Sequence, residues 1–200
     1  MFGNPVSNPM NWEVKELNEV CDVRDGTHDS PEYVEKGYPL VTSKNIVNGK
    51  LDLSNVNYIR EEDYKNINKR SKVDMGDIIM PMIGTIGNPL IIIEEPKFAI
   101  KNVALIKFNK TKISNMYIHL ILSSELMEQI KKMKSRGGTQ KFLSLNDIRK
   151  LKIPIPDFEL QNQFATFVQQ VDKSKLAVQK SLEELETLKQ ALMQQYFGIK

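Results

Sequence analysis

The residues from Phe158 onward most constrain what this chain can fold into, because they form one uninterrupted amphipathic pattern. No proline or glycine occurs between Phe158 and Phe197, and apolar residues recur at steps of three, four and seven. At 1.5 Å per residue such a helix is about 60 Å long, too long for a small neighbouring domain to cover. Its apolar stripe therefore needs another helix, from this chain or from a partner. The residues expected to make that contact are Val171, Val178, Leu182, Leu185, Leu188 and Leu192.

The residues before this helix predict a mixed α/β (α+β) domain. Apolar runs at residues 77–82, 90–93 and 103–108 are typical of buried strands, and residues 116–133 have helical spacing. Residues 58–69 are polar and predict a loop or a short helix. Ser114 or Asn115 can cap the start of the helix at 116–133, and Ser144 together with Asp147 is a candidate cap for a second, short helix. The prolines at 154 and 156 make residues 153–156 extended. We therefore expect a globular domain at residues 1–157, followed by a spacer and dimerisation helix at 158–200.

Charge is unevenly distributed along the chain. The net charge is only +3, but residues 131–152 hold eight basic residues against the single acid Asp147. Such a cluster is typical of a polyanion-binding surface, and equally of a solvated lysine-rich helix face. Cys21 is the single cysteine, which excludes an internal disulfide and favours the cytoplasm, and two histidines are too few to suggest a metal site. The longest apolar run, residues 90–93, is far too short to span a membrane.

A series of short motifs extends along nearly the whole chain. In chain order they are Trp12-Glu13-Val14-Lys15-Glu16-Leu17, Gly26-Thr27, Lys44-Asn45-Ile46, Gly76-Asp77-Ile78-Ile79, Ile83-Gly84-Thr85-Ile86-Gly87, residues 117–124, the glycine loop at 136–139, residues 145–148, Leu151-Lys152-Ile153-Pro154-Ile155-Pro156 leading to Gln161, and Leu188-Lys189-Gln190-Ala191-Leu192. In their order and spacing they resemble the specificity subunit of type I restriction–modification systems. The chain departs from the family at Asp157 and Leu160, where a second proline and a glutamate are frequent. Asp157 is still a good helix cap.

This resemblance implies one half of a specificity subunit. A full subunit carries two target recognition domains, each followed by a conserved helix, and the two helices pair as an antiparallel coiled coil. The implied partners are double-stranded DNA, methyltransferase and restriction subunits, and a second copy or another half-subunit. S-adenosylmethionine is expected on the methyltransferase and no cofactor on this chain. The opening residues 1–6 resemble the link that follows a conserved helix, as expected of a second-half module, a truncated gene product or an excised fragment.

The glycine loop is the segment we expect to contact DNA most directly. Glycines allow close backbone approach, basic side chains suit phosphates or guanine, and Gln140 can pair with adenine. The alternative is an ordinary mobile loop. Lys44-Asn45 and Thr27-His28 are weaker candidates, and each could instead be a surface turn. The candidate DNA-binding residues are Arg136, Gly137, Gly138, Thr139, Gln140 and Lys141, then Lys44 and Asn45, then Thr27 and His28.

Catalysis by this chain is not expected. Asp77 with Glu95-Pro96-Lys97 fits a metal-dependent nuclease pattern only superficially, because proline is unusual in the strand such a site needs. Asp77 is expected to fix the turn into the next strand, and residues 84–87 to form a tight turn rather than a phosphate cradle. The leading interpretation is a non-catalytic DNA-recognition module. An assembly adaptor that binds protein through its helix is the second interpretation, and a stand-alone nuclease the third.

Overall fold

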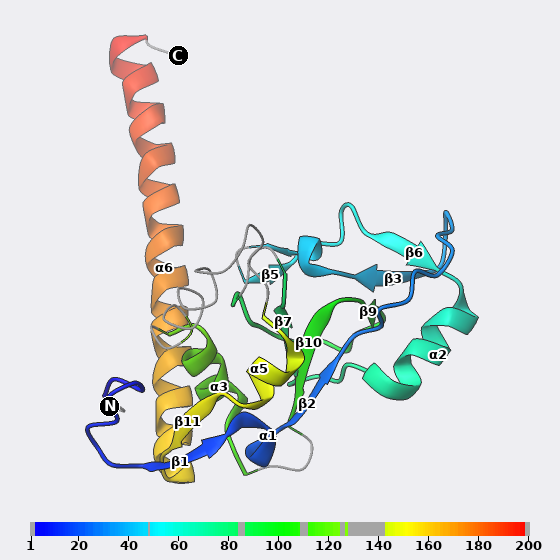
Figure 1. Ribbon diagram of the computed structural model, residues 1–200. Helices are drawn as coiled ribbons and strands as arrows, with labels where there is room; N and C mark the ends of the chain where they lie inside the picture. The colour runs from blue at the N-terminus through cyan, green and yellow to red at the C-terminus, as the bar shows by residue number, and fades with distance from the viewer. Residues whose placement is uncertain are drawn as a thin grey trace. The chain divides into compact units, whose positions relative to one another are not determined.

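The computed structural model describes residues 3–47, 49–83, 87–108, 112–124, 127 and 143–198 (Figure 1). The chain divides into two compact units, Met1–Gln161 and Asn162–Lys200. The boundary falls in the first turn of the long helix because Gln161 belongs to the first unit. Its side chain is 1% exposed, accepts a hydrogen bond from Ser114 N at 2.9 Å and donates one to Pro156 O at 2.8 Å.

A four-stranded sheet forms the centre of the first unit, in the order β2-β10-β7-β8. Strand β10 (Val103–Lys107) pairs antiparallel with β2 (Asp22–Asp25) and β7 (Ile78–Pro81), and β7 pairs antiparallel with β8 (Leu90–Ile91). Every residue of β7 and β10 is buried, as their continuous apolar runs predict. Alternate residues point to opposite faces, so each face of the sheet has its own core.

Different parts of the chain pack against the two faces of the sheet. Ile78, Met80, Ala104 and Ile106 pack with α3 (Asn115–Leu122), α5 (Leu145–Arg149) and α1 (Leu17–Val20). Ile79, Val103 and Leu105 pack on the other face with residues such as Val41, Phe98 and Ile100. Strands β1 (Glu13–Glu16) and β11 (Lys152–Ile155) form a separate antiparallel pair, which confirms that residues 153–156 are extended.

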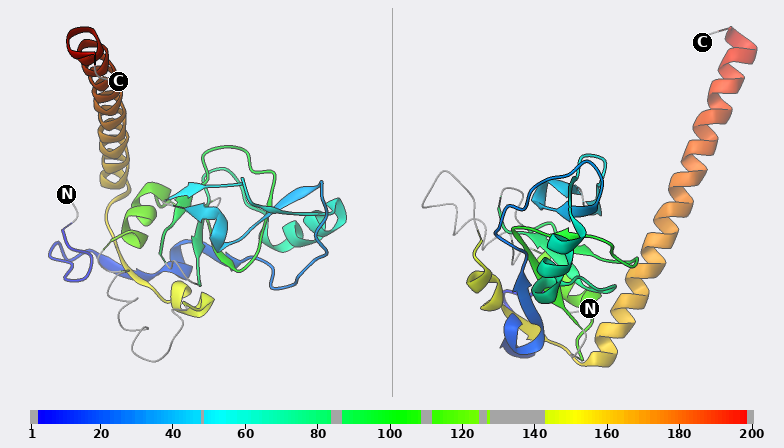
Figure 2. Two further views of the ribbon diagram at one scale, coloured as in Figure 1. Left: turned by 90° about the horizontal axis from the view of Figure 1, so that it is seen from above. Right: turned by 90° about the vertical axis from the view of Figure 1, so that its right-hand side faces the viewer.

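A smaller sheet, ordered β6-β3-β9, carries the candidate site. Strand β3 (Tyr38–Val41) pairs antiparallel with β6 (Asn57–Ile59) and parallel with β9 (Ala99–Ile100), and β4 (Ile46–Val47) forms a hairpin with β5 (Lys50–Leu51). The polar segment at 58–69 proves mostly helical, as α2 (Glu61–Ser71). Tyr64 and Ile67 of α2 pack on the sheet, and the rings of Tyr38 and Tyr64 stack at 4.0 Å. In Figure 1 and in the left view of Figure 2, this sheet and α2 lie at one end of the first unit, with β1 and β11 at the other.

The predicted caps are confirmed, but one predicted helix ends early. Ser144 Oγ accepts a hydrogen bond from Asp147 N at 3.1 Å, and Ser114 Oγ accepts one from Tyr117 N at 3.4 Å. The helix expected over 116–133 is interrupted, because α3 ends at Leu122 with Ser123 as its C-cap. Met127 is helical again, and the other residues of 125–133 lie outside the described part of the chain. Ser124 Oγ donates to Ile121 O at 2.6 Å, a side-chain bond that competes with helix continuation.

The second unit is the rest of helix α6 (Phe158–Phe197), which confirms the predicted forty-residue helix. Its apolar stripe is exposed, with Val178 at 69%, Leu185 at 62% and Leu188 at 55%. Within the described residues, no helix is long and apolar enough to cross a membrane.

Candidate nucleic-acid interface

The glycine loop that we expected to contact DNA most directly lies outside the described residues. This covers Arg136, Gly137, Gly138, Thr139, Gln140 and Lys141, so their DNA contacts stay a prediction. Of the basic cluster around them, Arg149, Lys150 and Lys152 are described. The two lysines are exposed, whereas Arg149 has a structural role. Its guanidinium donates from Nε and Nη2 to Val23 O at 3.0 and 2.8 Å, which ties α5 to β2.

The two other predicted segments come together where strands β2, β3 and β9 end. Thr27 N donates to Ile100 O at 3.0 Å and Asn102 N donates to Thr27 O at 3.2 Å, so the turn after β9 lies beside the loop after β2. Lys101 N donates to Val41 O at 2.9 Å, which places the end of β3 on the other side of the same turn. We call residues 26–30, 42–45 and 101–102 the loop cluster.

Gly26 and Thr27 shape the first loop of this cluster. A Cβ atom at Gly26 would lie 2.5 Å from Ile100 O, so only glycine allows the backbone to approach β9 this closely. Thr27 is 8% exposed, and its Oγ1 accepts a hydrogen bond from Asp29 N at 3.1 Å. Thr27 therefore sets the path of the loop, and its hydroxyl is hydrogen-bonded to Asp29.

Lys44 and Asn45 are neighbours with different environments. Asn45 is 5% exposed, and its Oδ1 accepts from Thr42 N at 3.0 Å and Thr42 Oγ1 at 3.1 Å. Its Nδ2 donates to Asp52 O at 3.1 Å. These bonds cap the short 3₁₀ helix Ser43–Asn45, on which Lys44 is exposed. Of the two, the structure leaves Lys44 as the side chain able to reach a ligand.

His28 is the exposed centre of a charged chain across the cluster. Its Nδ1 lies 2.7 Å from Asn102 Oδ1 and its Nε2 lies 2.8 Å from Asp25 Oδ2. The other carboxylate oxygen of Asp25 accepts a 2.7 Å bond from Arg70 Nη2. The hydrogen bond between the ring and Asn102 has the largest effect on the pKa of His28, and the bond to Asp25 the next largest. Both raise this pKa above its usual value.

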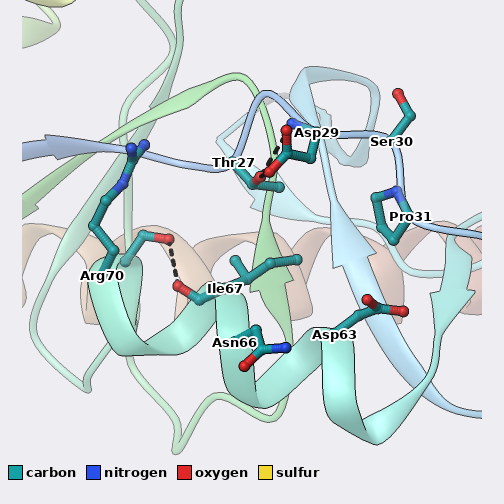
Figure 3. Close-up of a pocket in the computed structure, with 9 residues that line it drawn as sticks. Thr27, Asp29, Ser30, Pro31, Asp63, Asn66, Ile67 and Arg70 are labelled. Carbon is teal, nitrogen blue, oxygen red and sulfur yellow. Dashed lines mark hydrogen bonds between the residues drawn. The ribbon is translucent and has the colours of Figure 1, made fainter.

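A polar cavity lies between this loop and α2 (Figure 3). Its volume is about 400 Å³, and Asp63, Asn66, Ile67 and Arg70 of α2 face the residues that follow Gly26. Lys101 Nζ donates to Ser30 Oγ at 2.5 Å, so the far end of the loop is also held. The cluster thus presents His28, Arg70 and Lys44 on a frame whose buried polar groups are hydrogen-bonded, as a rigid recognition surface requires.

Comparison with known proteins identifies the family. Residues 9–188 match the model of the type I restriction modification DNA specificity domain. The chain belongs to this family.

Relatives of this specificity domain include two specificity subunits. It is 28% identical to the putative type I restriction enzyme MjaX specificity subunit of Methanocaldococcus jannaschii, over 94% of this chain and 46% of the relative. It is 27% identical to the EcoBI specificity subunit of Escherichia coli, over 94% of this chain and 42% of the relative. The chain therefore spans less than half the length of these relatives.

Solved structures share the fold of the specificity domain. The HsdS subunit from Thermoanaerobacter tengcongensis superposes with a TM-score of 0.63 at 18% identity, covering 94% of this chain and 45% of that one. A type I system S subunit from M. genitalium superposes with a TM-score of 0.58 at 20% identity, covering 92% and 45%.

Sequence reasoning missed Asn102 in the loop cluster, and Arg70 and Asp25 beside it. Arg70 lies near the end of α2, in a region for which the sequence predicted either a loop or a short helix. Asp25 belongs to β2, a strand within an acidic stretch that the sequence did not predict. Asn102 adopts a positive φ of 55°, a conformation that asparagine tolerates, in the turn between two apolar strands. The polar turn between β9 and β10 was a signal for a loop at this position. It did not indicate which other loops would lie beside it.

The nuclease pattern does not form a metal site in this specificity domain. Asp77 is 3% exposed, and its Oδ2 accepts bonds from Lys107 Nζ at 2.6 Å and Asp74 N at 2.8 Å. The prediction that Asp77 fixes the turn before β7 is confirmed. Glu95 is exposed, and the described residues contain no group of three or more histidine, cysteine or acidic side chains that could hold a metal ion.

Proposed function

We propose that this specificity domain is a non-catalytic DNA reader that recognises one half of a bipartite target in a type I restriction–modification complex. The family match over residues 9–188 carries the proposal. The loop cluster supports it, because exposed cations on a hydrogen-bonded frame suit phosphate and base contacts. In this proposal, methyl transfer and cleavage belong to methyltransferase and restriction subunits, and S-adenosylmethionine binds to the methyltransferase.

Helix α6 has a separate role in this proposal. Its exposed stripe pairs antiparallel with the same helix of a second copy, or with that of another half-subunit. A symmetric dimer would present two identical readers to inverted half-sites, so its target would be an interrupted palindrome. Pairing with a different half-subunit would instead give an asymmetric target.

The test is a methylation profile. The chain is expressed with its methyltransferase subunit in a host that lacks other modification systems, and methylated positions are mapped across the genome. We expect one bipartite motif with a fixed gap. Its absence when the chain is omitted is the control. Methylation that is unchanged without this chain would contradict the proposal.

A binding assay separates this proposal from the assembly adaptor. A DNA reader should bind a duplex carrying the profiled motif with an affinity that falls steeply with salt, and a random duplex more weakly. An adaptor would assemble with the methyltransferase and show no affinity for either duplex. Arg136→Ala and Lys141→Ala then report whether the glycine loop contributes, and Gln140→Ala whether it reads a base.

A further inference from the structure

The hydrogen bonds of His28 match a charged ring, because the amide oxygen of Asn102 faces the ring. Both ring nitrogens face oxygen atoms, Asn102 Oδ1 at 2.7 Å and Asp25 Oδ2 at 2.8 Å. A neutral imidazole carries only one N–H, so it would leave one of these oxygens facing a lone pair. A protonated ring donates to both. The geometry therefore matches the imidazolium form.

The charges around His28 come from three segments. Asp25, on β2, faces it as a carboxylate that also binds Arg70 Nη2 on α2, and Asn102 faces it from the turn after β9. Hydrogen bonds that the ring donates to Asn102 Oδ1 and Asp25 Oδ2 favour the charged ring, and the positive charge of Arg70 opposes it. The carboxylate of Asp25 lies between the two cations, and its side chain is 19% exposed. The side chains of His28 and Arg70 are each 62% exposed, so water still screens part of this attraction.

This chain of contacts adds side-chain bonds to the backbone bonds that already join the loop after β2 to the turn after β9. His28 connects the loop after β2 to Asn102, and Arg70 Nη2 also donates to Gly26 O at 3.2 Å. Loss of the proton on His28 removes one of its two bonds, and the loop is then held at only one side of the ring.

We propose that His28 is a positioning residue whose protonated ring holds the loop at residues 26–30 in its DNA-reading position, so that DNA binding weakens as His28 loses its proton. This rests on the proposed function. The sign follows from linkage: bonds that favour the charged form stabilise the folded loop below the ordinary histidine pKa of about 6.5. That stabilisation is lost as the pH rises through the raised pKa of His28. Bound DNA, a polyanion, favours the same protonated form.

A first experiment needs no DNA. Ring ¹⁵N and ¹H signals of the two histidines are followed by NMR across the pH range in the full chain. We expect His28 to titrate above the ordinary value of about 6.5, with protons on both nitrogens in its charged form. His119 is the internal control, because burial lowers its pKa. A His28 that titrates at or below the ordinary value would overturn the proposal.

Two variants at Asn102 sharpen this measurement. Asn102→Asp keeps a side chain that tolerates positive φ and adds a negative charge, so the titration of His28 should move to higher pH. Asn102→Gly keeps the backbone free and removes the acceptor, so the titration should move to lower pH. Unchanged titrations in both variants would show that the Asn102 contact does not form.

A second experiment measures the affinity for the duplex carrying the profiled motif between about pH 6 and about pH 8.5, spanning the histidine range. One linked proton weakens binding by at most about tenfold per pH unit, and we expect a total loss of about three- to tenfold. His28→Gln should bind weakly and without this pH dependence, whereas His119→Gln should retain it. Binding that stays flat in the unmutated chain would contradict this inference alone. A chain that binds no DNA at any pH would contradict the proposed function.

Discussion

At the scale of single residues, Lys44 and Asn45 show how neighbouring side chains can serve different ends. Replacing Asn45 with alanine removes the buried partner of Thr42 N and Asp52 O. We expect Asn45→Ala to lower the free energy of unfolding by about 1–3 kcal/mol, measured by urea denaturation. Lys44→Ala, the matched variant, should leave unfolding unchanged and reduce the slope of DNA affinity against salt by about one ion. An Asn45→Ala chain of normal stability that loses DNA binding would instead assign base contact to Asn45.

A second prediction at this scale concerns the contribution of the buried cation Lys107 to stability. Its Nζ contacts Lys72 O at 2.9 Å, Asp74 Oδ2 at 2.8 Å and Asp77 Oδ2 at 2.6 Å, and its side chain is 4% exposed. Lys107→Met would leave the carboxylate of Asp77 buried without its counter-charge, a loss of about 3–5 kcal/mol in unfolding free energy. Lys65→Met breaks the exposed pair with Glu61 and should barely move the denaturation midpoint. A Lys107→Met chain as stable as the Lys65→Met control would contradict this account.

At the scale of elements, local signals were predictable and non-local pairings were not. Continuous apolar runs predicted β7 and β10, the Ser144 and Asp147 pattern predicted the start of α5, and unbroken periodicity predicted α6. The parallel pairing of β3 with β9 joins segments far apart in the sequence, and no local pattern encodes it. Because that pairing creates the loop cluster, the sequence named Thr27, His28, Lys44 and Asn45 without showing that they meet.

The exposed stripe of α6 carries a prediction about oligomeric state. Leu185 is 62% exposed in the isolated chain and lies in the stripe expected to pair with a second helix. Leu185→Glu places a charge in that seam and should shift a dimer to monomers in sedimentation experiments at tens of micromolar. Gln190→Glu adds the same charge about 200° around the helix from Leu188 and should leave the dimer intact. A monomeric unmutated chain at these concentrations would contradict pairing between copies.

At the scale of the whole molecule, the chain joins a reader to a helix of 40 residues, which at 1.5 Å each spans about 60 Å, or about 18 base pairs of DNA. In an antiparallel pair the register of the helices sets the distance between two readers. Deleting residues 182–188 removes one heptad, keeps the stripe in phase and shortens the helix by about 10 Å, or about three base pairs. In an assembled complex, the methylated half-sites should stay the same while the gap between them contracts. Deleting three residues puts the stripe out of phase and should abolish pairing, which makes it the control. A heptad-deleted chain that methylates with an unchanged gap and full activity would show that another part of the complex sets the spacing.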